Sequence, residues 1–208
     1  MQHNKDTEFV MYVDNFLSIE TLESLQETFL NLKYSEVKNP EGQTYGYRHT
    51  FPHSFHTDPL LQIIKNYFFP NRNLKPISVS AHLRQNNKEP LFHVDVEKGN
   101  VANFLFFVKG ESLLNNGTGF MTGSSLSSHI GFIENRALFF NGSKIPHSDL
   151  QSFGDSSKRY TLNIFYREIS NGAGHTDLQL HIWPLVNDFN ENLIYSIFVD
   201  HVFHDLYY

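Results

Sequence analysis

Three residues of this 208-residue chain could together hold one metal ion. His93 and Asp95 lie one residue apart in residues 91–96, whose pattern predicts a β-strand. Alternate residues of a strand point to the same face, so both side chains are expected to reach one ion. His147 would add a second imidazole. Two imidazoles and one carboxylate can occupy one face of an iron(II) ion and leave its other face open.

The tripeptide His-x-Asp is not selective by itself, because the chain contains four copies. They begin at His56, His93, His147 and His175. Asp58 of the first copy precedes a proline and an apolar run, which predicts the N-cap of a helix. A site built on either of the last two copies would have no basic residue after its final histidine to bind an anion, since neither lysine nor arginine follows Arg167. Context therefore favours His93 and Asp95.

An arginine expected beside this site could hold an anion. Residues 159–166 are a β-prone run, and alternation puts four side chains on one face: Arg159, Thr161, Asn163 and Phe165. A planar guanidinium matches a carboxylate with parallel hydrogen bonds. An anion held next to an open iron position suggests a dicarboxylate co-substrate.

The order of these residues resembles a known enzyme family. His93-x-Asp95, then a strand with Leu138-Phe139-Phe140, His147, and Arg159-x-Thr161 is similar to the Fe(II)- and 2-oxoglutarate-dependent dioxygenases, most closely their prolyl 4-hydroxylase-like branch. The resemblance covers residues 76–168.

The resemblance implies roles for individual residues. His93, Asp95 and His147 would be the catalytic iron ligands. Arg159 would bind the distal carboxylate of 2-oxoglutarate, with Thr161 as a weaker hydroxyl partner. Fe(II), 2-oxoglutarate and O2 are thus the expected cofactors and co-substrates.

One departure from the family concerns the strand before the first histidine. That branch commonly has a tyrosine there that helps to bind the distal carboxylate, and residues 78–85 contain none. His82 and Arg84 lie on the same face of this predicted strand and are the candidates to replace it.

The implied reaction is hydroxylation of an unactivated C–H bond with release of succinate and CO2. Asp95, where a halogenase would have a small residue, favours hydroxylation over halogenation. The closest branch suggests a peptidyl proline as substrate, and a free amino acid or small metabolite is the alternative. Residues 34–55, expected as a loop, are the candidate substrate contact because several large side chains gather there: Tyr45, Tyr47, Arg48, Phe51 and Phe55.

Two other interpretations remain open at this point. The same β-domain could be a non-catalytic binding module, which would not depend on 2-oxoglutarate or on Arg159. A cupin-like metalloenzyme that uses no keto acid would keep the His/Asp/His site and make Arg159 structural.

The chain is expected to be one domain, mainly β with bracing helices around a double-stranded β-helix (jelly-roll, cupin-like) core. Residues 1–75 would hold a strand at 9–13, a helix from Ser18 to about Leu32, the loop, and a second helix from Asp58 to near Pro70. Residues 76–169 would form the core. Residues 170–208 would be an acidic extension with an apolar helical stripe, expected as a docking helix or a homodimer contact, with a substrate lid as the alternative.

Composition limits the partners. The formal net charge is −6 and basic residues form no cluster, which argues against a nucleic-acid substrate. No cysteine is present, so disulfides and thiolate metal sites are excluded. The sequence has neither a signal-peptide pattern nor an apolar run of membrane-spanning length, and a cytoplasmic location is expected.

Overall fold

The structure of the chain is a computed structural model that describes residues 10–38, 42, 44–52, 61, 64–65, 73–85, 92–95, 100–150 and 158–169. Its elements in chain order are β1 (Val10–Val13), α1 (Ile19–Asn31), β2 (Ser35–Lys38), β3 (Thr44–Thr50), β4 (Leu74–Gln85), β5 (Asn100–Lys109), β6 (Leu113–Thr122), β7 (Ser125–Phe132), β8 (Arg136–Phe140), β9 (His147–Leu150) and β10 (Lys158–Glu168).

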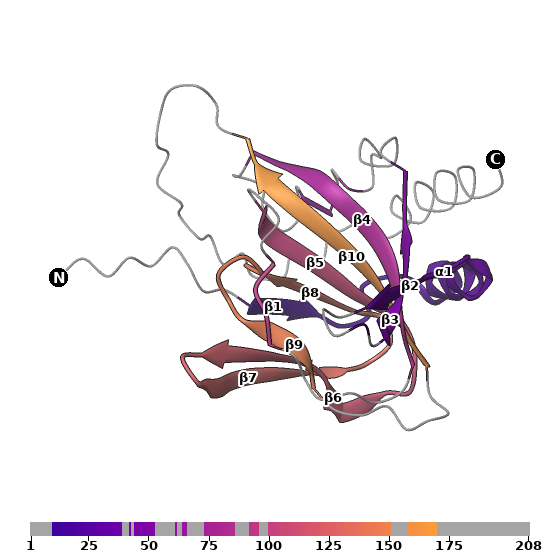
Figure 1. The fold of residues 1–208 in the computed structure, drawn as a ribbon. Coiled ribbons are helices and arrows are strands. Elements are labelled where there is room, and N and C mark those ends of the chain that lie inside the picture. The colour runs from indigo at the N-terminus through magenta and orange to yellow at the C-terminus, as the bar shows by residue number, and fades with distance from the viewer. Residues whose placement is uncertain are drawn as a thin grey trace.

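The strands form two antiparallel sheets that face each other (Figure 1). The large sheet has the order β1-β8-β5-β10-β4-β3-β2, and the small sheet has the order β7-β6-β9. From β5 onward the chain passes back and forth between the two sheets, as in a double-stranded β-helix. The predicted fold class is confirmed.

Helix α1 braces the outer face of the large sheet, as predicted. Ser18 is its N-cap, and the Ser18 hydroxyl accepts a hydrogen bond from the backbone N–H of Thr21 at 3.3 Å. Leu25 and Phe29 bury their side chains in the core that this helix shares with the sheet. The predicted helix after Asp58 is described only at a few residues, of which Leu61 and Ile64 are helical and buried in the same core.

Strand β10 has two chemically different faces, as the alternation predicts. Tyr160, Leu162, Ile164 and Tyr166 are buried in the core on the helix side of the large sheet. Arg159, Thr161, Asn163 and Phe165 line the space between the two sheets. Alternation on β4 works in the same way, so that His82 and Arg84 also face this space.

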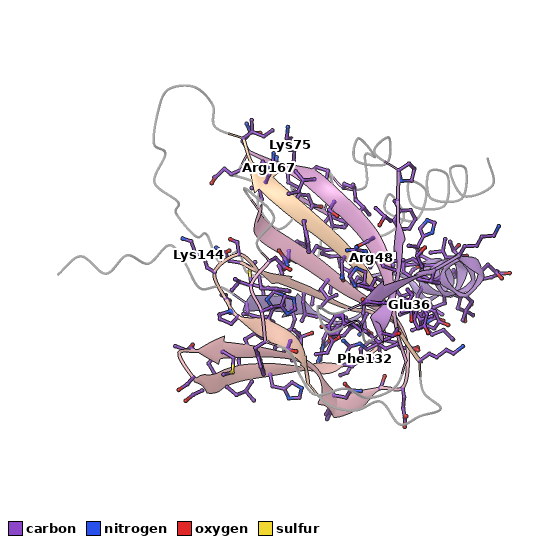
Figure 2. The ribbon with its side chains drawn as sticks, in the orientation of Figure 1. Glu36, Arg48, Lys75, Phe132, Lys144 and Arg167 are labelled. Atoms are coloured by element: carbon purple, nitrogen blue, oxygen red, sulfur yellow. The ribbon has the colours of Figure 1, made fainter. Side chains whose placement is uncertain are left out.

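Aromatic side chains close part of the gap between the sheets. Phe107 of β5 stacks on Phe132 of β7 with ring centroids 4.5 Å apart, and Phe132 is labelled in Figure 2. Phe120 of β6 packs edge-on against Phe140 of β8 at 5.1 Å. These contacts leave a cavity beside the aromatic cluster with both polar and apolar lining residues, and the candidate site lies there.

Two sequence-based expectations were wrong. Residues 34–55 are not a loop, because β2 and β3 add two strands to the edge of the large sheet. An edge strand tolerates polar side chains, which weakens the apolar signal that sequence analysis depends on. Residues 92–95 are not a strand either, since only His93 forms a β-bridge. The chain leaves the ladder after this bridge, and the Asp95 N–H donates instead to the Gly142 carbonyl at 2.8 Å.

Phe55 and residues 170–208, with their predicted docking helix, lie outside the described residues. None of the helices that the structure describes has the length and apolar run needed to cross a membrane.

Candidate metal centre and anion site

Backbone pairing brings the two histidines together. The N–H of His93 donates to the carbonyl of His147 at 3.1 Å, and the N–H of His147 donates to the carbonyl of His93 at 2.9 Å. Their imidazole centroids are 4.7 Å apart. A segment far upstream and the first residue of β9 are therefore fixed to each other by main-chain hydrogen bonds, independently of any metal.

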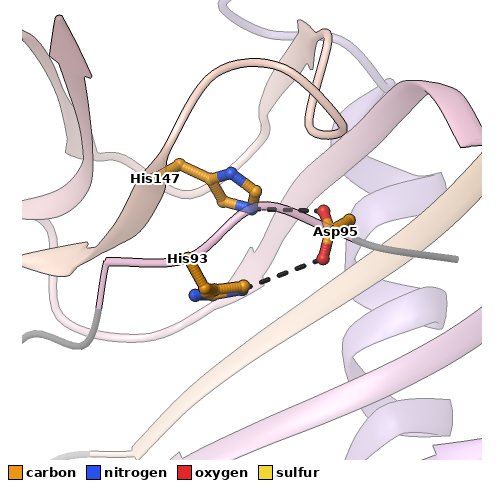
Figure 3. A group of neighbouring side chains, drawn as sticks. All are labelled: His93, Asp95 and His147. Carbon is orange, nitrogen blue, oxygen red and sulfur yellow. Dashed lines mark ion pairs between the residues drawn. The ribbon is translucent and has the colours of Figure 1, made fainter. Parts of the chain in front are cut away.

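The third member of the group is Asp95, toward which both imidazoles turn (Figure 3). The His147 Nε2 lies 3.2 Å from one carboxylate oxygen, and the His93 Nε2 lies 3.8 Å from the other. One possible ligand atom from each of the three residues lies within 4.8 Å of the others. Two nitrogen donors and one carboxylate at this spacing fit one iron(II) ion. The structure thus brings together the three residues that the sequence predicts as metal ligands.

Neighbouring groups fix the orientation of this set. The Nδ1 of His147 lies 2.9 Å from the Ile145 carbonyl, which requires the proton on Nδ1 and leaves Nε2 to face Asp95 with its lone pair. The Asn103 side-chain amide donates to Asp95. Gly142 backs the same carboxylate: a Cβ there would lie 2.6 Å from the Asp95 Oδ2 and 2.3 Å from the Asn103 Nδ2. The site therefore has an outer shell of partners that is already in place.

Exposure differs sharply among the three side chains. The His93 side chain is 42% exposed, whereas those of Asp95 and His147 are 13% and 10% exposed. Burial raises the pKa of Asp95, but the adjacent His147 imidazole and the hydrogen bond from the Asn103 amide outweigh this and hold the pKa below its usual value. The carboxylate is thus ionised near neutral pH, as a metal ligand must be.

One cavity of about 100 Å³ joins the metal group to two arginines. It lies between the sheets, and its lining comes from both of them. The lining residues are Tyr45, His82, Arg84, His93, Asp95, Asn103, Phe104, Leu105, Thr118, Phe140, His147, Ser148, Asp149, Arg159, Thr161, Asn163 and Phe165.

Arg159 is deeply placed at one side of this cavity. Its side chain is 4% exposed, and its guanidinium carbon lies 5.7 Å and 5.3 Å from the ring centroids of Phe107 and Phe132. Arg84 is its direct cross-strand partner on β4. Two like charges directly opposite on neighbouring strands repel, so an anion between them is favoured.

That anion is Asp149, a residue that sequence reasoning set aside. One Asp149 oxygen lies 3.0 Å from the Arg84 Nε, and the other accepts a hydrogen bond from Arg159. Burial alone would raise the pKa of Asp149, but the charges of Arg159 and Arg84 hold the pKa below its usual value. Asp149 appeared in the sequence only as part of a rejected His-x-Asp copy. Its position two residues after His147, on the same face of a strand, was the signal that could have placed it in the cavity.

No family model matches the sequence, and no curated protein matches it. Solved structures do match. A prolyl hydroxylase from Trichoplax adhaerens, in complex with a hypoxia-inducible factor peptide, has a TM-score of 0.60 at 12% identity over 76% of this chain and 83% of that one. A Pseudomonas putida prolyl-4-hydroxylase has a TM-score of 0.58 at 9% identity over 79% and 95%. HygX from Streptomyces hygroscopicus, with nickel and 2-oxoglutarate bound, has a TM-score of 0.58 at 11% identity over 78% and 84%.

The chain has the fold of the 2-oxoglutarate- and iron(II)-dependent oxygenases. Within this fold, His82 and Arg84 differ in their hydrogen-bond partners. His82 lies between Ser80 and Asn163, with its Nε2 2.9 Å from the Ser80 Oγ and its Nδ1 3.1 Å from the Asn163 Nδ2. An amide nitrogen can only donate, so the Nδ1 of His82 accepts and its Nε2 carries the proton.

Both nitrogens of His82 are therefore used within the protein. The His82 side chain keeps some exposed surface, but protein atoms surround most of it. This burial lowers the pKa of His82 to about 3, and the charges of Arg84 and Arg48 act in the same direction. His82 is a neutral imidazole near pH 7.

A tyrosine does line the cavity of this oxygenase fold, from a strand that the sequence analysis missed. Tyr45 belongs to β3, its carbonyl accepts a hydrogen bond from Arg84 at 2.6 Å, and its ring lies under the Arg84 guanidinium with 3.5 Å between carbon and centroid. Burial raises the pKa of the Tyr45 hydroxyl, partly offset by Arg84. Tyr45 thus fixes the second arginine of the anion site.

Proposed function

We propose that this protein is an iron(II)- and 2-oxoglutarate-dependent dioxygenase that hydroxylates an unactivated C–H bond. The observation that carries the proposal is that His93, Asp95 and His147 share one cavity with Arg159 and Arg84. A metal group alone would fit many functions. A metal group beside a buried Arg159 and a partly buried Arg84 fits a co-substrate that chelates a metal at one end and carries a carboxylate at the other.

In this proposal His93, Asp95 and His147 hold the iron. When bound, the iron and 2-oxoglutarate would supply the activation of O2, with succinate and CO2 as products. The protein orients the ligands: the Ile145 carbonyl sets the His147 tautomer, and Asn103 holds the Asp95 carboxylate.

Arg159 is the residue proposed to bind the distal carboxylate of 2-oxoglutarate. Phe107 and Phe132 surround its guanidinium with apolar rings, so its hydrogen bonds are made away from bulk water, where they are strong. Thr161 is buried on the same face of β10 and offers a hydroxyl. Arg84, held by Tyr45, is the proposed replacement for the tyrosine missing from β4.

A peptidyl proline is the leading candidate substrate. Support comes from the fold shared with two prolyl hydroxylases, one of them crystallised with a peptide. The exposed His93 edge of the metal group leaves an open side at which a peptide could approach. A small molecule is the second candidate, favoured by the similar fold of HygX, which has also been crystallised with hygromycin B.

The test is whether the Fe(II)-loaded protein converts 2-oxoglutarate to succinate in air, with succinate measured in proton NMR spectra. Proline-containing peptides and a panel of amino acids would be added in parallel, because a true substrate accelerates succinate formation. His147→Ala is the matched inactive control. Succinate formation that needs His147 supports the proposal. Its absence with every substrate class, in protein shown to hold iron, favours the non-catalytic or cupin-like alternative.

A further inference from the structure

Strand β9 contributes two functional side chains to one face. His147 and Asp149 are two residues apart, and both line the cavity between the sheets. The first faces Asp95 at the metal group, and the second contacts both arginines of the anion site. A single short strand therefore joins the two halves of the proposed catalytic centre.

Asp149 occupies the guanidinium positions that an incoming carboxylate needs. It uses one oxygen for Arg84 and the other for Arg159, which is the pattern a bound dicarboxylate would make at its distal end. Arg84 and Arg159 together carry two positive charges at directly paired positions of β4 and β10. Asp149 neutralises one of them and leaves a net positive charge that still attracts an anion.

The surroundings of Asp149 can accommodate its movement. β9 is a four-residue strand at the edge of the small sheet, and the Asp149 side chain is 25% exposed. Thr118 of β6 is its direct cross-strand neighbour and also lines the cavity. Thr118 is 2% exposed, and its hydroxyl has no hydrogen-bond partner within the described part of the chain. A buried hydroxyl without a partner costs free energy, so it is a ready donor to a carboxylate that shifts toward it or enters beside it.

We infer that Asp149 is an internal competitor for the co-substrate carboxylate, and that it sets the affinity and selectivity of the anion site. This inference rests on the proposed function. Before the co-substrate binds, Asp149 bridges the two arginines and holds both in place. Binding exchanges one carboxylate for another at Arg159, and the Asp149 side chain turns away. Ligands without a distal carboxylate cannot make this exchange, so they are rejected.

The opposite role for Asp149 predicts the opposite result. If Asp149 stayed on Arg159 and only aimed it at the ligand, removal of its charge would loosen the arginine and weaken co-substrate binding. The sign of one change in affinity separates the two roles.

The experiment is calorimetric titration of 2-oxoglutarate into Ni(II)-loaded wild-type protein, Asp149→Asn and Asp149→Ala. We expect at least a tenfold lower Kd for both variants, because the competitor has gone and two uncompensated arginines remain. We also expect a lower Tm without ligand, and a larger gain in Tm on adding 2-oxoglutarate than in the wild type. The Tm series provides a second readout if one variant is too unstable for calorimetry.

Asp14→Asn is the matched control. Asp14 forms an ion pair with Arg136, at 2.5 Å from its Nε, and neither residue lines the cavity. This variant should lose stability and keep the wild-type Kd. If the wild-type protein binds 2-oxoglutarate and both Asp149 variants bind it with the same or a lower affinity, the inference is overturned. The proposed function then still stands. Failure of all the proteins to bind 2-oxoglutarate overturns both.

Discussion

His93 and His147 hold each other through two main-chain hydrogen bonds of 3.1 Å and 2.9 Å, and this bridge connects the segment that carries Asp95 to strand β9. The group of His93, Asp95 and His147 thus depends on backbone pairing between distant segments, and its side chains are oriented by neighbours that are not themselves candidate ligands. Changes in those neighbours should affect metal binding without removing any ligand.

Asn103 is the first such neighbour. Its amide donates to Asp95, so Asn103→Ala should let the carboxylate turn and weaken Fe(II) binding by about 10- to 100-fold. Competition with a coloured chelator under anaerobic conditions measures this affinity. Asn31→Ala on the exposed side of α1 is the matched control and should bind iron as the wild type does. Wild-type affinity in Asn103→Ala would show that Asp95 is held in another way.

Gly142 should tolerate no side chain. A Cβ at this position would lie within 2.6 Å of both the Asn103 amide and the Asp95 carboxylate, so Gly142→Ala should displace the two and weaken metal binding at least tenfold. The protein should stay folded, because the atoms that must move are the ends of side chains. Ser143→Ala, one residue further on, is the control for the turn itself. Equal metal affinity in Gly142→Ala and Ser143→Ala would contradict the close approach.

Substitution of Arg159 should weaken the binding of the co-substrate and leave the affinity for the metal unchanged. Arg159→Gln removes the charged fork and should raise the Kd for 2-oxoglutarate by about 100-fold, equivalent to about 2.7 kcal/mol. Fe(II) affinity in the absence of 2-oxoglutarate should stay within about threefold of the wild type. Both constants come from titrations of the same preparations. A loss of metal affinity of the same size would mean that Arg159 supports the fold of the cavity instead.

His82 should make stability depend on pH. Its pKa is about 3 in the folded protein, against about 6.5 in an unfolded chain. Below pH 6.5 the unfolded chain therefore binds a proton that the folded protein does not, and stability falls as the pH falls toward 3. The loss approaches about 1.4 kcal/mol per pH unit for one proton.

Urea unfolding at pH 7.5 and pH 5.0 measures this effect. His82→Gln should lose less stability between the two pH values than the wild type, because glutamine can keep a hydrogen bond to Ser80 or Asn163 and does not titrate. This window lies above the range in which Asp95 and Asp149 take up protons, since their pKa values are lowered. Identical losses in the two proteins would show that His82 is not a buried neutral imidazole.

The sequence predicted the parts of the fold whose signals are local. β10 and α1 have strong periodicity, so their buried and exposed faces followed from spacing alone. The edge strands β2 and β3 were missed because an edge position needs no apolar alternation. The predicted strand around His93 is absent, but the predicted proximity of His93 and Asp95 is confirmed. The Asp95 N–H donates to the Gly142 carbonyl, and this hydrogen bond keeps the carboxylate beside the histidine.

The residues of the candidate site likewise fall into those that local sequence predicts and those that only the tertiary structure brings together. Residue type and order were enough to select His93, Asp95, His147 and Arg159, because few side chains can do metal and carboxylate chemistry. Tyr45 and Asn103 reach the cavity from β3 and β5, and only the tertiary structure puts them there. Asp149 shares β9 with His147, and its spacing of two residues was a signal that the sequence did contain. Register between β6 and β9, which sequence does not reveal, decides that Asp149 lies beside Thr118.

The most direct measurement is an anaerobic titration of the Fe(II)-loaded protein with 2-oxoglutarate, recording the visible charge-transfer absorption of the iron chelate. His147→Ala and Arg159→Ala would be titrated alongside. The account predicts a band in the wild type, no band in His147→Ala, and a band that needs far more 2-oxoglutarate in Arg159→Ala. The absence of any band in iron-replete wild-type protein would contradict it, because His93, Asp95, His147 and Arg159 would then not form one co-substrate site.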